Sequence, residues 1–209
     1  GSLQVAEWAD LGVTDYNAPI VREGVHLGPD AAAGLVRGLR HALKDFDVLN
    51  LQKMPAMVGQ SRNPLVDALA TQASEMFGNR FRTPDSYADW MQHIGKHAHK
   101  EFERCWRVFT RHPQARFVRA ATVDEGLALL RQLSALQDRR RAETPSYFLD
   151  QAPYVAFYED LVREQLPAGR AVVTALMAGD EMVAGLFSIF DGERFTMLRI
   201  AMAGEAWKA

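Results

Sequence analysis

The chain has 209 residues, 48% of them apolar, which suits one large globular domain or two small ones. Its net charge of −2 gives no electrostatic case for binding nucleic acid, and we expect no membrane span and no signal peptide, because no apolar stretch is long enough. Cys105 is the one cysteine, so an intramolecular disulfide is excluded and a reducing, cytoplasmic location is expected.

The first part of the chain predicts short elements of mixed type. Pro29-Asp30 begins a helix to about residue 45, with Leu35, Leu39 and Leu43 on one face. The other elements expected here are an irregular strand and loop over 3–20, a short strand over 47–51, a loop over 56–64, and a short helix or irregular connection over 65–77.

The middle of the chain predicts longer helices. One helix is expected from Pro84-Asp85-Ser86 to about Arg111, and a strand over 115–120 follows it. Thr122 and Glu125 have the spacing of a capping box, in which each side chain binds the free amide of the other, so a helix is expected from there to about Arg141. Pro153 begins a further helix to about Gln165, after a loop over 142–152.

Residues 171–203 predict three consecutive strands. Ala178-Gly179-Asp180 and Asp191-Gly192-Glu193 separate them, and Gly and Asp suit the tight turns of hairpins. The order of elements predicts an α/β (α+β) fold. A sheet that ends on an apolar strand normally needs a further element to cover its edge, so we expect a domain that is unfinished at Ala209.

The helix expected over 86–111 contains residues that invite a metal or nucleophile interpretation. His93, His97 and His99 lack a His-Glu-x-x-His pattern and have lysine neighbours, so we favour a solvated basic face over a zinc site and expect no metal. Cys105 has no CxxC partner, and we favour a buried structural thiol over a nucleophile.

Other residues that could have a chemical function could also have a purely structural role. Arg139-Arg140-Arg141 suits the end of a helix, with a phosphate or anionic substrate site as the alternative. Tyr154, Phe157 and Tyr158 form a stripe that we expect in the core. No Walker loop, Gly-x-Gly-x-x-Gly or Gly-x-Ser-x-Gly is present. Polar residues in loops are often functional, so three further candidates are Asp10, Asp15 and Tyr16. A structural role in the turns of this loop explains their presence about as well.

The run Asp10-Leu11-Gly12-Val13-Thr14-Asp15-Tyr16-Asn17-Ala18-Pro19 resembles a segment near the front of bacterial GNAT-superfamily acetyltransferases of the cellulose-biosynthesis type, relatives of the FemAB-like tandem-GNAT proteins. The similarity continues in the right order over most of the chain. The further segments are Lys53-Met54-Pro55, Asn63-Pro64-Leu65, Trp106 to Pro113, Leu176 to Glu181, and Met197 to Ile200.

The resemblance implies a mixed sheet flanked by helices, in tandem half-domains. These would be a degenerate GNAT-like half over 3–85, a connecting helix over 86–112, and a second half over 113–209 that stops before the pyrophosphate loop. Acetyl-CoA would be the co-substrate, held by backbone groups of a strand and by a helix N-terminus after it. Residues 195–203 look like that strand, so the implied cofactor-binding residues are Leu198, Arg199, Ile200, Ala201 and Met202.

The implied reaction is direct transfer of an acyl group to a sugar or amine, which a carboxylate or water would deprotonate. Asp15 and Tyr16 are the candidates for the acceptor side, and Arg199 is an alternative contact for an anionic acceptor. Aminoacyl transfer from tRNA is disfavoured by the net charge. The chain itself would then be an acetyltransferase or an inactive fragment of one. The competing hypothesis is a non-catalytic GNAT-like scaffold or interaction module, whose open sheet edge pairs with another chain as a homodimer.

Overall fold

The computed structural model describes residues 1–10, 14–22, 24–75, 78, 81–141 and 152–204, except for the side chains of 139–141. These residues form two compact units, Gly1–Arg82 and Thr83–Ala209. None of the described helices combines the length and apolarity that a bilayer crossing requires. The mixed α/β (α+β) class expected from the sequence is confirmed.

The first unit pairs two short strands in parallel and has a small apolar core. β1 (Val5–Glu7) lies beside β2 (Val48–Asn50), and α1 (Pro29–Ala42) connects them along the chain. α1 packs against α2 (Pro64–Ala68). The buried apolar side chains among the described residues of this unit are Ala32, Val36, Pro64 and Leu65. Buried polar contacts also connect its described segments.

One expectation for the first unit is wrong. Residues 56–64 contain a hairpin, β3 (Met57–Val58) and β4 (Ser61–Arg62), where a loop was expected. Gly59 in its turn has a φ of +61°, which glycine adopts without steric cost. The strands have two residues each, which is too short for an alternating pattern to reveal them.

The second unit begins with two helices where one was expected over 86–112. α3 (Tyr87–His93) and α4 (Gly95–Thr110) are separate because Gly95 has a φ of +70°, a left-handed conformation that interrupts a right-handed helix. Trp90 and Phe102 meet edge to face across the break, with ring centroids 6.1 Å apart. The two helices therefore form a bent pair with aromatic contacts on its inner side.

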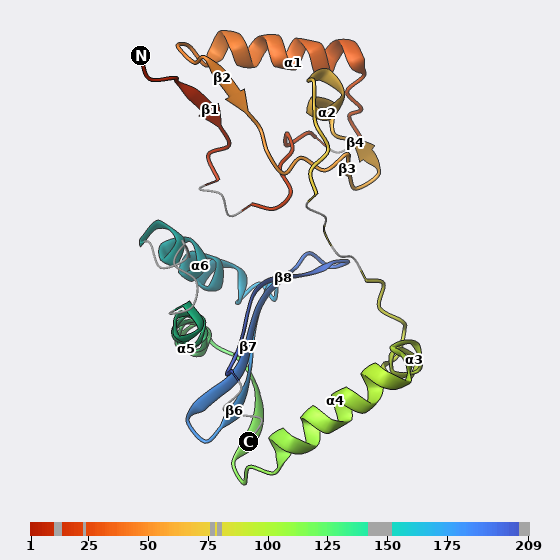
Figure 1. Ribbon diagram of the computed structural model, residues 1–209, viewed down its shortest axis with the longest axis vertical. Coiled ribbons are helices and arrows are strands. Elements are labelled where there is room, and N and C mark those ends of the chain that lie inside the picture. The colour runs from red at the N-terminus through yellow and green to blue at the C-terminus, as the bar shows by residue number, and fades with distance from the viewer. Residues whose placement is uncertain (11–13, 23, 76–77, 79–80, 142–151, 205–209) are drawn as a thin grey trace. The chain divides into compact units, whose positions relative to one another are not determined.

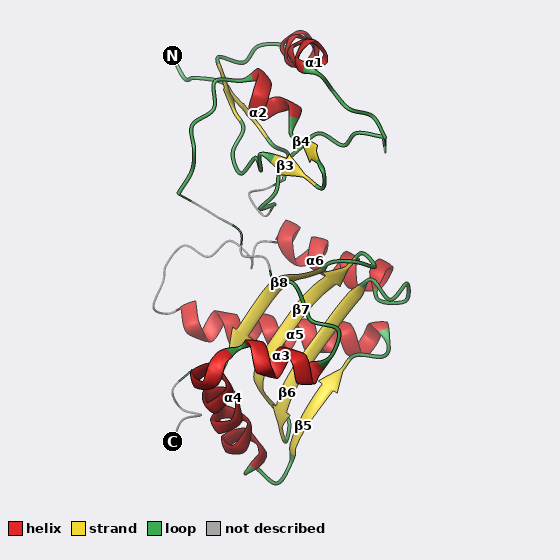
Figure 2. Ribbon diagram, turned by 90° about the vertical axis from the view of Figure 1, so that its right-hand side faces the viewer, coloured by secondary structure: helices red, strands yellow, loops and turns green. Residues whose placement is uncertain are grey.

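The rest of the second unit is an antiparallel sheet of four strands in the order β5-β6-β7-β8. The strands are β5 (Ala115–Arg119), β6 (Ala171–Ala178), β7 (Glu181–Phe190) and β8 (Phe195–Met202). α5 (Val123–Arg141) and α6 (Ala152–Gln165) cover one face (Figure 1, Figure 2). The core between them buries Leu133, Val162, Val173 and Phe187 to within 1% exposure.

The start of α5 has the capping box that the sequence predicted. The Thr122 hydroxyl accepts from the Glu125 amide at 3.3 Å, and the Glu125 carboxylate accepts from the Ala121 and Thr122 amides at 2.7 and 3.3 Å. These bonds satisfy amides that a helix start leaves free. The box therefore fixes where α5 begins and how it leaves β5.

The opposite face of the sheet exposes large apolar side chains. Cross-strand partners share a face, and one row runs from Phe117 through Leu176 and Ala184 to Met202. The row beside it ends in Leu186 and Ile200. We call this the open face; its most exposed apolar side chains among the described residues are Phe117, Met197, Ile200 and Met202.

Candidate active site

β8 is the last strand of the sheet, and its register contains an irregularity. Phe187 lies opposite Arg199 and Ser188 lies opposite Met197, so Leu198 has no partner on β7. This is a β-bulge, which leaves one residue of the strand outside the ladder and bends the strand locally. The bulge falls within the segment that the sequence analysis associates with acetyl-CoA.

Backbone groups on the outer side of β8 face away from the ladder. The Ala203 amide donates to the Val183 carbonyl at 2.7 Å, so residue 203 points its backbone toward β7. Antiparallel pairing alternates between residues that bond inward and residues that face outward. Ile200 and Met202 therefore present amide and carbonyl groups at the outer edge, where no described strand pairs with them.

The alternation expected for β8 is confirmed at its C-terminal end. Arg199 and Ala201 are buried against α5 and α6, whereas Ile200 and Met202 are exposed on the open face. The alternative role for Arg199, contacting an anionic acceptor, does not fit a side chain that is 5% exposed and held by two helices. The strand itself is therefore the better candidate for cofactor contact than this side chain.

Arg199 and Gln137 form a polar link between β8 and α5. The Arg199 guanidinium donates to Gln137 Oε1 from Nε at 3.0 Å and also from Nη2. Gln137 Nε2 donates to the backbone carbonyl of Ile200 at 3.1 Å. The guanidinium carbon also lies 5.0 Å from the ring centroid of Tyr158 on α6, within cation–π range.

In the first unit, the structure brings together residues from three of the segments that carry the resemblance. The backbone amide of Asn17 donates to the backbone carbonyl of Lys53 at 2.8 Å, and the side-chain Nδ2 of Asn63 donates to the backbone carbonyl of Asn17 at 3.1 Å. Asn17 Nδ2 donates to Asp10 Oδ2 and to the Gln52 carbonyl, both at 3.1 Å. Asn17 and Asn63 are both buried, and their polar groups are satisfied by these bonds between described residues of the three segments.

The predicted acceptor-side residues lie at the surface of this network. Asp15 pairs with the Lys53 ammonium at 3.2 Å, and its side chain is 71% exposed. Tyr16 is largely exposed, and its hydroxyl lies against Gly78, so close that a Cβ added to this glycine would come within 1.8 Å of the hydroxyl oxygen. Asp15 and Tyr16 belong to the first unit and Leu198–Met202 to the second. Their roles as acceptor-side and cofactor-side residues stay predictions.

The remaining candidates on α3 and α4 lie at the surface. The described residues contain no group of three or more His, Cys, Asp or Glu side chains that could hold a metal ion. His99 instead contacts Glu103 one turn away, at 3.3 Å. The expectation that Cys105 is buried is wrong, because its side chain is exposed on α4. Arg104 lowers the pKa of nearby Glu101 to about 2.

Expectations for α5 and α6 are only partly met. Tyr154 and Tyr158 are buried as expected, whereas Phe157 is 46% exposed and its ring lies edge to face with that of Tyr158, with centroids 5.3 Å apart. The side chains of Arg139-Arg140-Arg141 lie outside the described residues, so their capping or anion-binding role stays a prediction.

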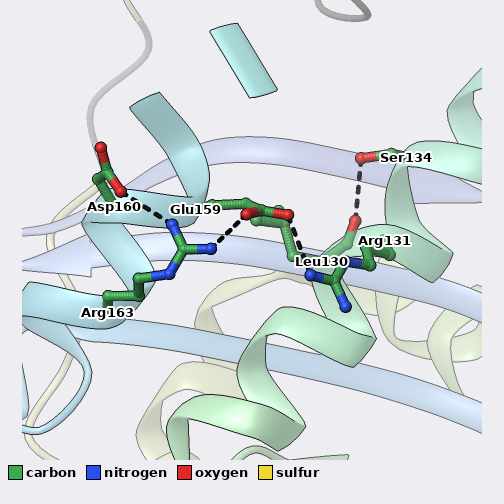
Figure 3. Close-up of polar contacts among 6 residues, drawn as sticks. All are labelled: Leu130, Arg131, Ser134, Glu159, Asp160 and Arg163. Atoms are coloured by element: carbon green, nitrogen blue, oxygen red, sulfur yellow. Dashed lines mark hydrogen bonds and ion pairs between the residues drawn. The ribbon is translucent and has the colours of Figure 1, made fainter. Parts of the chain in front are cut away.

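An ion-pair network joins the two helices that cover the sheet (Figure 3). Glu159 lies between Arg131 of α5, at 3.3 Å, and Arg163 of α6, at 2.5 Å. Arg163 also pairs with Asp160 at 2.9 Å, and both acidic partners raise its pKa. The network holds α6 on α5, and so supports the layer against which Arg199 is buried.

Sequence reasoning missed Gln137, Lys53 and Asn63 as side chains that shape the two candidate regions. A glutamine in an amphipathic helix has no distinguishing pattern, so nothing in the sequence singles out Gln137. Asn63 did carry a signal, because an asparagine before a proline is typical of a helix N-cap. Lys53 has a φ of +56°, which no local pattern predicts for lysine.

The described part of the second unit thus defines a class: an α/β domain with two helices on one face of an antiparallel sheet, whose bulged edge strand β8 has no further described strand beside it. A family model described as acetyltransferase (GNAT) domain matches residues 96–209, more than half of the chain, and the chain belongs to this family. Searches of curated proteins and of solved structures found no significant match. Membership supports a general acyltransferase function.

Proposed function

We propose that the chain is an acetyl-CoA-dependent N- or O-acetyltransferase that transfers its acyl group directly to a sugar or amine acceptor. The observation that carries this proposal is the outer edge of β8, where a bulge at Leu198 precedes the outward backbone groups of Ile200 and Met202. An extended thioester arm with amide groups can bond to such an edge as a further strand would. Membership of the GNAT family supports the same reading.

The chemistry needs few protein groups. The acceptor's nitrogen or oxygen attacks the thioester carbonyl and loses a proton to a base, and the carbon–sulfur bond then breaks to release the thiol. Outward amides of β8 are suited to stabilise the negative charge that develops on the carbonyl oxygen. We assign Asp15 and Tyr16 to the acceptor side, because they are exposed next to an ordered loop network. No metal is required.

A more specific proposal follows from the resemblance of the segment around Asp10–Asn17 to acetyltransferases of the cellulose-biosynthesis type. We propose that the enzyme is of the cellulose-biosynthesis, FemAB-like type, acts in the cytoplasm, and modifies a saccharide unit for polysaccharide biosynthesis. A sugar hydroxyl or amino group would suit direct acyl transfer. Activity assays with acetyl-CoA and a panel of hexoses, amino sugars and simple amines would distinguish these acceptors, since free thiol is released in every case.

The β8 edge can be tested by removing a single amide. Ile200→Pro deletes an outward N–H without deleting a bond of the β7 ladder, so the sheet should persist, as proline is tolerated on edge strands. Ile200→Ala is the matched control, because it removes the side chain and keeps the amide. In calorimetric titration we expect acetyl-CoA to bind the unaltered chain and Ile200→Ala with similar affinity, and Ile200→Pro about tenfold more weakly.

Two outcomes would contradict this proposal. Absence of acetyl-CoA binding by the unaltered chain would remove the cofactor assignment altogether. Equal affinity of Ile200→Pro and Ile200→Ala, with both variants folded, would place the cofactor elsewhere than on β8. Circular dichroism of the two variants establishes that both are folded.

The open face favours a second candidate, a non-catalytic module that pairs with a second copy of the chain. Phe117, Met197, Ile200 and Met202 are all more than half exposed there, and contiguous apolar surface commonly marks an interface. Light scattering should then show a dimer that Met197→Lys converts to a monomer. A monomer throughout, with acetyl-CoA bound, would leave the enzyme as the better account.

A further inference from the structure

Gln137 is the described side chain that joins the outer edge of β8 to the helices behind the sheet. Its Oε1 accepts from Nε and Nη2 of Arg199, and its Nε2 donates to the Ile200 carbonyl at 3.1 Å. We call this set of hydrogen bonds the Gln137 bridge. The bridge ends on one of the outward backbone groups that the proposed function assigns to cofactor contact.

The orientation of the Gln137 amide is determined by charge. A guanidinium has only donors, so the oxygen of the amide must face Arg199 and its nitrogen must face the Ile200 carbonyl. Arg199 cannot easily turn away, because it is 5% exposed and lies over the Tyr158 ring. The buried cation therefore keeps the N–H of Gln137 directed at the edge of β8.

The bridge makes the edge of β8 asymmetric. At Ile200 the outward carbonyl already accepts a hydrogen bond from Gln137, whereas the outward amide of the same residue has no described strand beside it. An arm that lies along this edge can place an acceptor at the Ile200 amide. A donor placed at the Ile200 carbonyl would have to share that oxygen with Gln137, which makes the carbonyl a poorer partner for the arm.

We propose that Gln137 is a positioning residue that sets the register of the acyl-CoA arm on β8, an inference that rests on the proposed function. By competing for the Ile200 carbonyl, Gln137 favours the pairing in which the arm bonds to the Ile200 amide. The thioester carbonyl then stops at a fixed distance from the bulge at Leu198. Gln137 acts through the strand and need not touch the acceptor.

The Gln137→Glu substitution distinguishes a role of Gln137 in positioning the acyl-CoA arm from a role in packing α5 on the sheet. The carboxylate keeps both acceptor contacts with Arg199 and strengthens them by charge, but it has no N–H for the Ile200 carbonyl. Gln132→Glu makes the same chemical change at an exposed site on α5 and serves as the control. We therefore expect the two variants to have similar unfolding midpoints.

Calorimetric titration with acetyl-CoA and amide hydrogen exchange test the proposal together. We expect Gln137→Glu to bind acetyl-CoA about three- to tenfold more weakly than Gln132→Glu, and to exchange amides of β8 faster. Equal affinities in two variants that both bind would overturn the register role and leave the proposed function standing. Absence of binding by the unaltered chain would overturn both, while the exchange rates would still show whether the bridge holds the strand.

Discussion

The carbonyl of Lys53 accepts a 2.8 Å hydrogen bond from the amide of Asn17, and Lys53 adopts a φ of +56° in doing so. A left-handed conformation is unfavourable for a residue with a Cβ, and here it joins two loops far apart in sequence. The strain at Lys53 is therefore tied to a contact that holds these two segments together.

Replacing Lys53 with glycine should therefore be better tolerated than replacing it with alanine. Both variants lose the ion pair with Asp15, so the difference between them reports the backbone alone. We expect Lys53→Gly to be about 1 kcal/mol more stable than Lys53→Ala, as glycine adopts positive φ without a steric penalty. Urea unfolding of the two variants measures the difference, and equal stabilities would show that the left-handed conformation carries no strain.

Substitution by alanine should have opposite effects on stability at Gly126 and at Gly38, although both glycines lie within helices. A Cβ at Gly126 would meet Leu166 Cδ1 and Val162 Cγ1 at 2.8 Å, whereas a Cβ at Gly38 meets nothing within 4 Å. We expect Gly38→Ala to stabilise the chain by about 0.5–1 kcal/mol and Gly126→Ala to destabilise it by about 1–3 kcal/mol. Chemical denaturation compares them; a gain at both positions would contradict the close packing of α5 on α6.

The Glu159 network should contribute measurably, and in a salt-dependent way. Glu159 is 17% exposed between two arginines, so Glu159→Gln should cost about 0.5–1 kcal/mol of stability at low ionic strength. Glu164→Gln, on an exposed position of the same helix, is the control and should cost less. Repeating the unfolding in 1 M salt should shrink the difference, since salt screens partly exposed charges. A difference that is unchanged by salt would argue for packing instead.

The turn between β7 and β8 should weaken in acid. The Asp191 carboxylate accepts from the amides of Glu193 and Arg194 at 3.0 and 2.7 Å, and these bonds lower its pKa. Because the folded-state pKa is depressed, the ionised carboxylate stabilises the fold at pH values above its unfolded pKa of about 3.9. That contribution is lost as the pH falls through the lower, folded-state value.

Carboxyl NMR titration of Asp191 checks this directly. We expect its midpoint to lie below the ordinary value for aspartate, and we expect Asp191→Asn to reduce the loss of stability on acidification. An asparagine keeps an acceptor oxygen but has no charge to lose. A midpoint at or above the ordinary value would show that the turn amides do not bind the carboxylate in solution.

The sequence predicted elements whose signals are local. The box of Thr122 and Glu125, the glycine turns at 179 and 192, and the alternation of β8 after Leu198 all depend on near neighbours, and each is confirmed. The break at Gly95 was missed because a single glycine within a helical pattern is often tolerated. Cys105 was misplaced because the absence of a CxxC partner argues against a redox role but does not show whether another element covers the thiol.

The sequence predicted only the part of the candidate site that consists of backbone groups, which is the strand β8. β8 was located from its pattern, but its bulge depends on register with β7, which the sequence of β8 alone does not encode. Gln137 and Arg199 are 62 residues apart, and their contact exists only once α5 lies on the sheet. Asn17, Lys53 and Asn63 likewise meet only after their loops fold together.

Since the chain contains one cysteine and its thiol lies at the surface of α4, a maleimide dye or a nitroxide can be attached at a single known position without engineering. Such a label on the second unit, combined with one introduced cysteine in the first, would yield distances by energy transfer or pulsed electron resonance. Those distances would measure the separation of the two units with and without a thioester ligand.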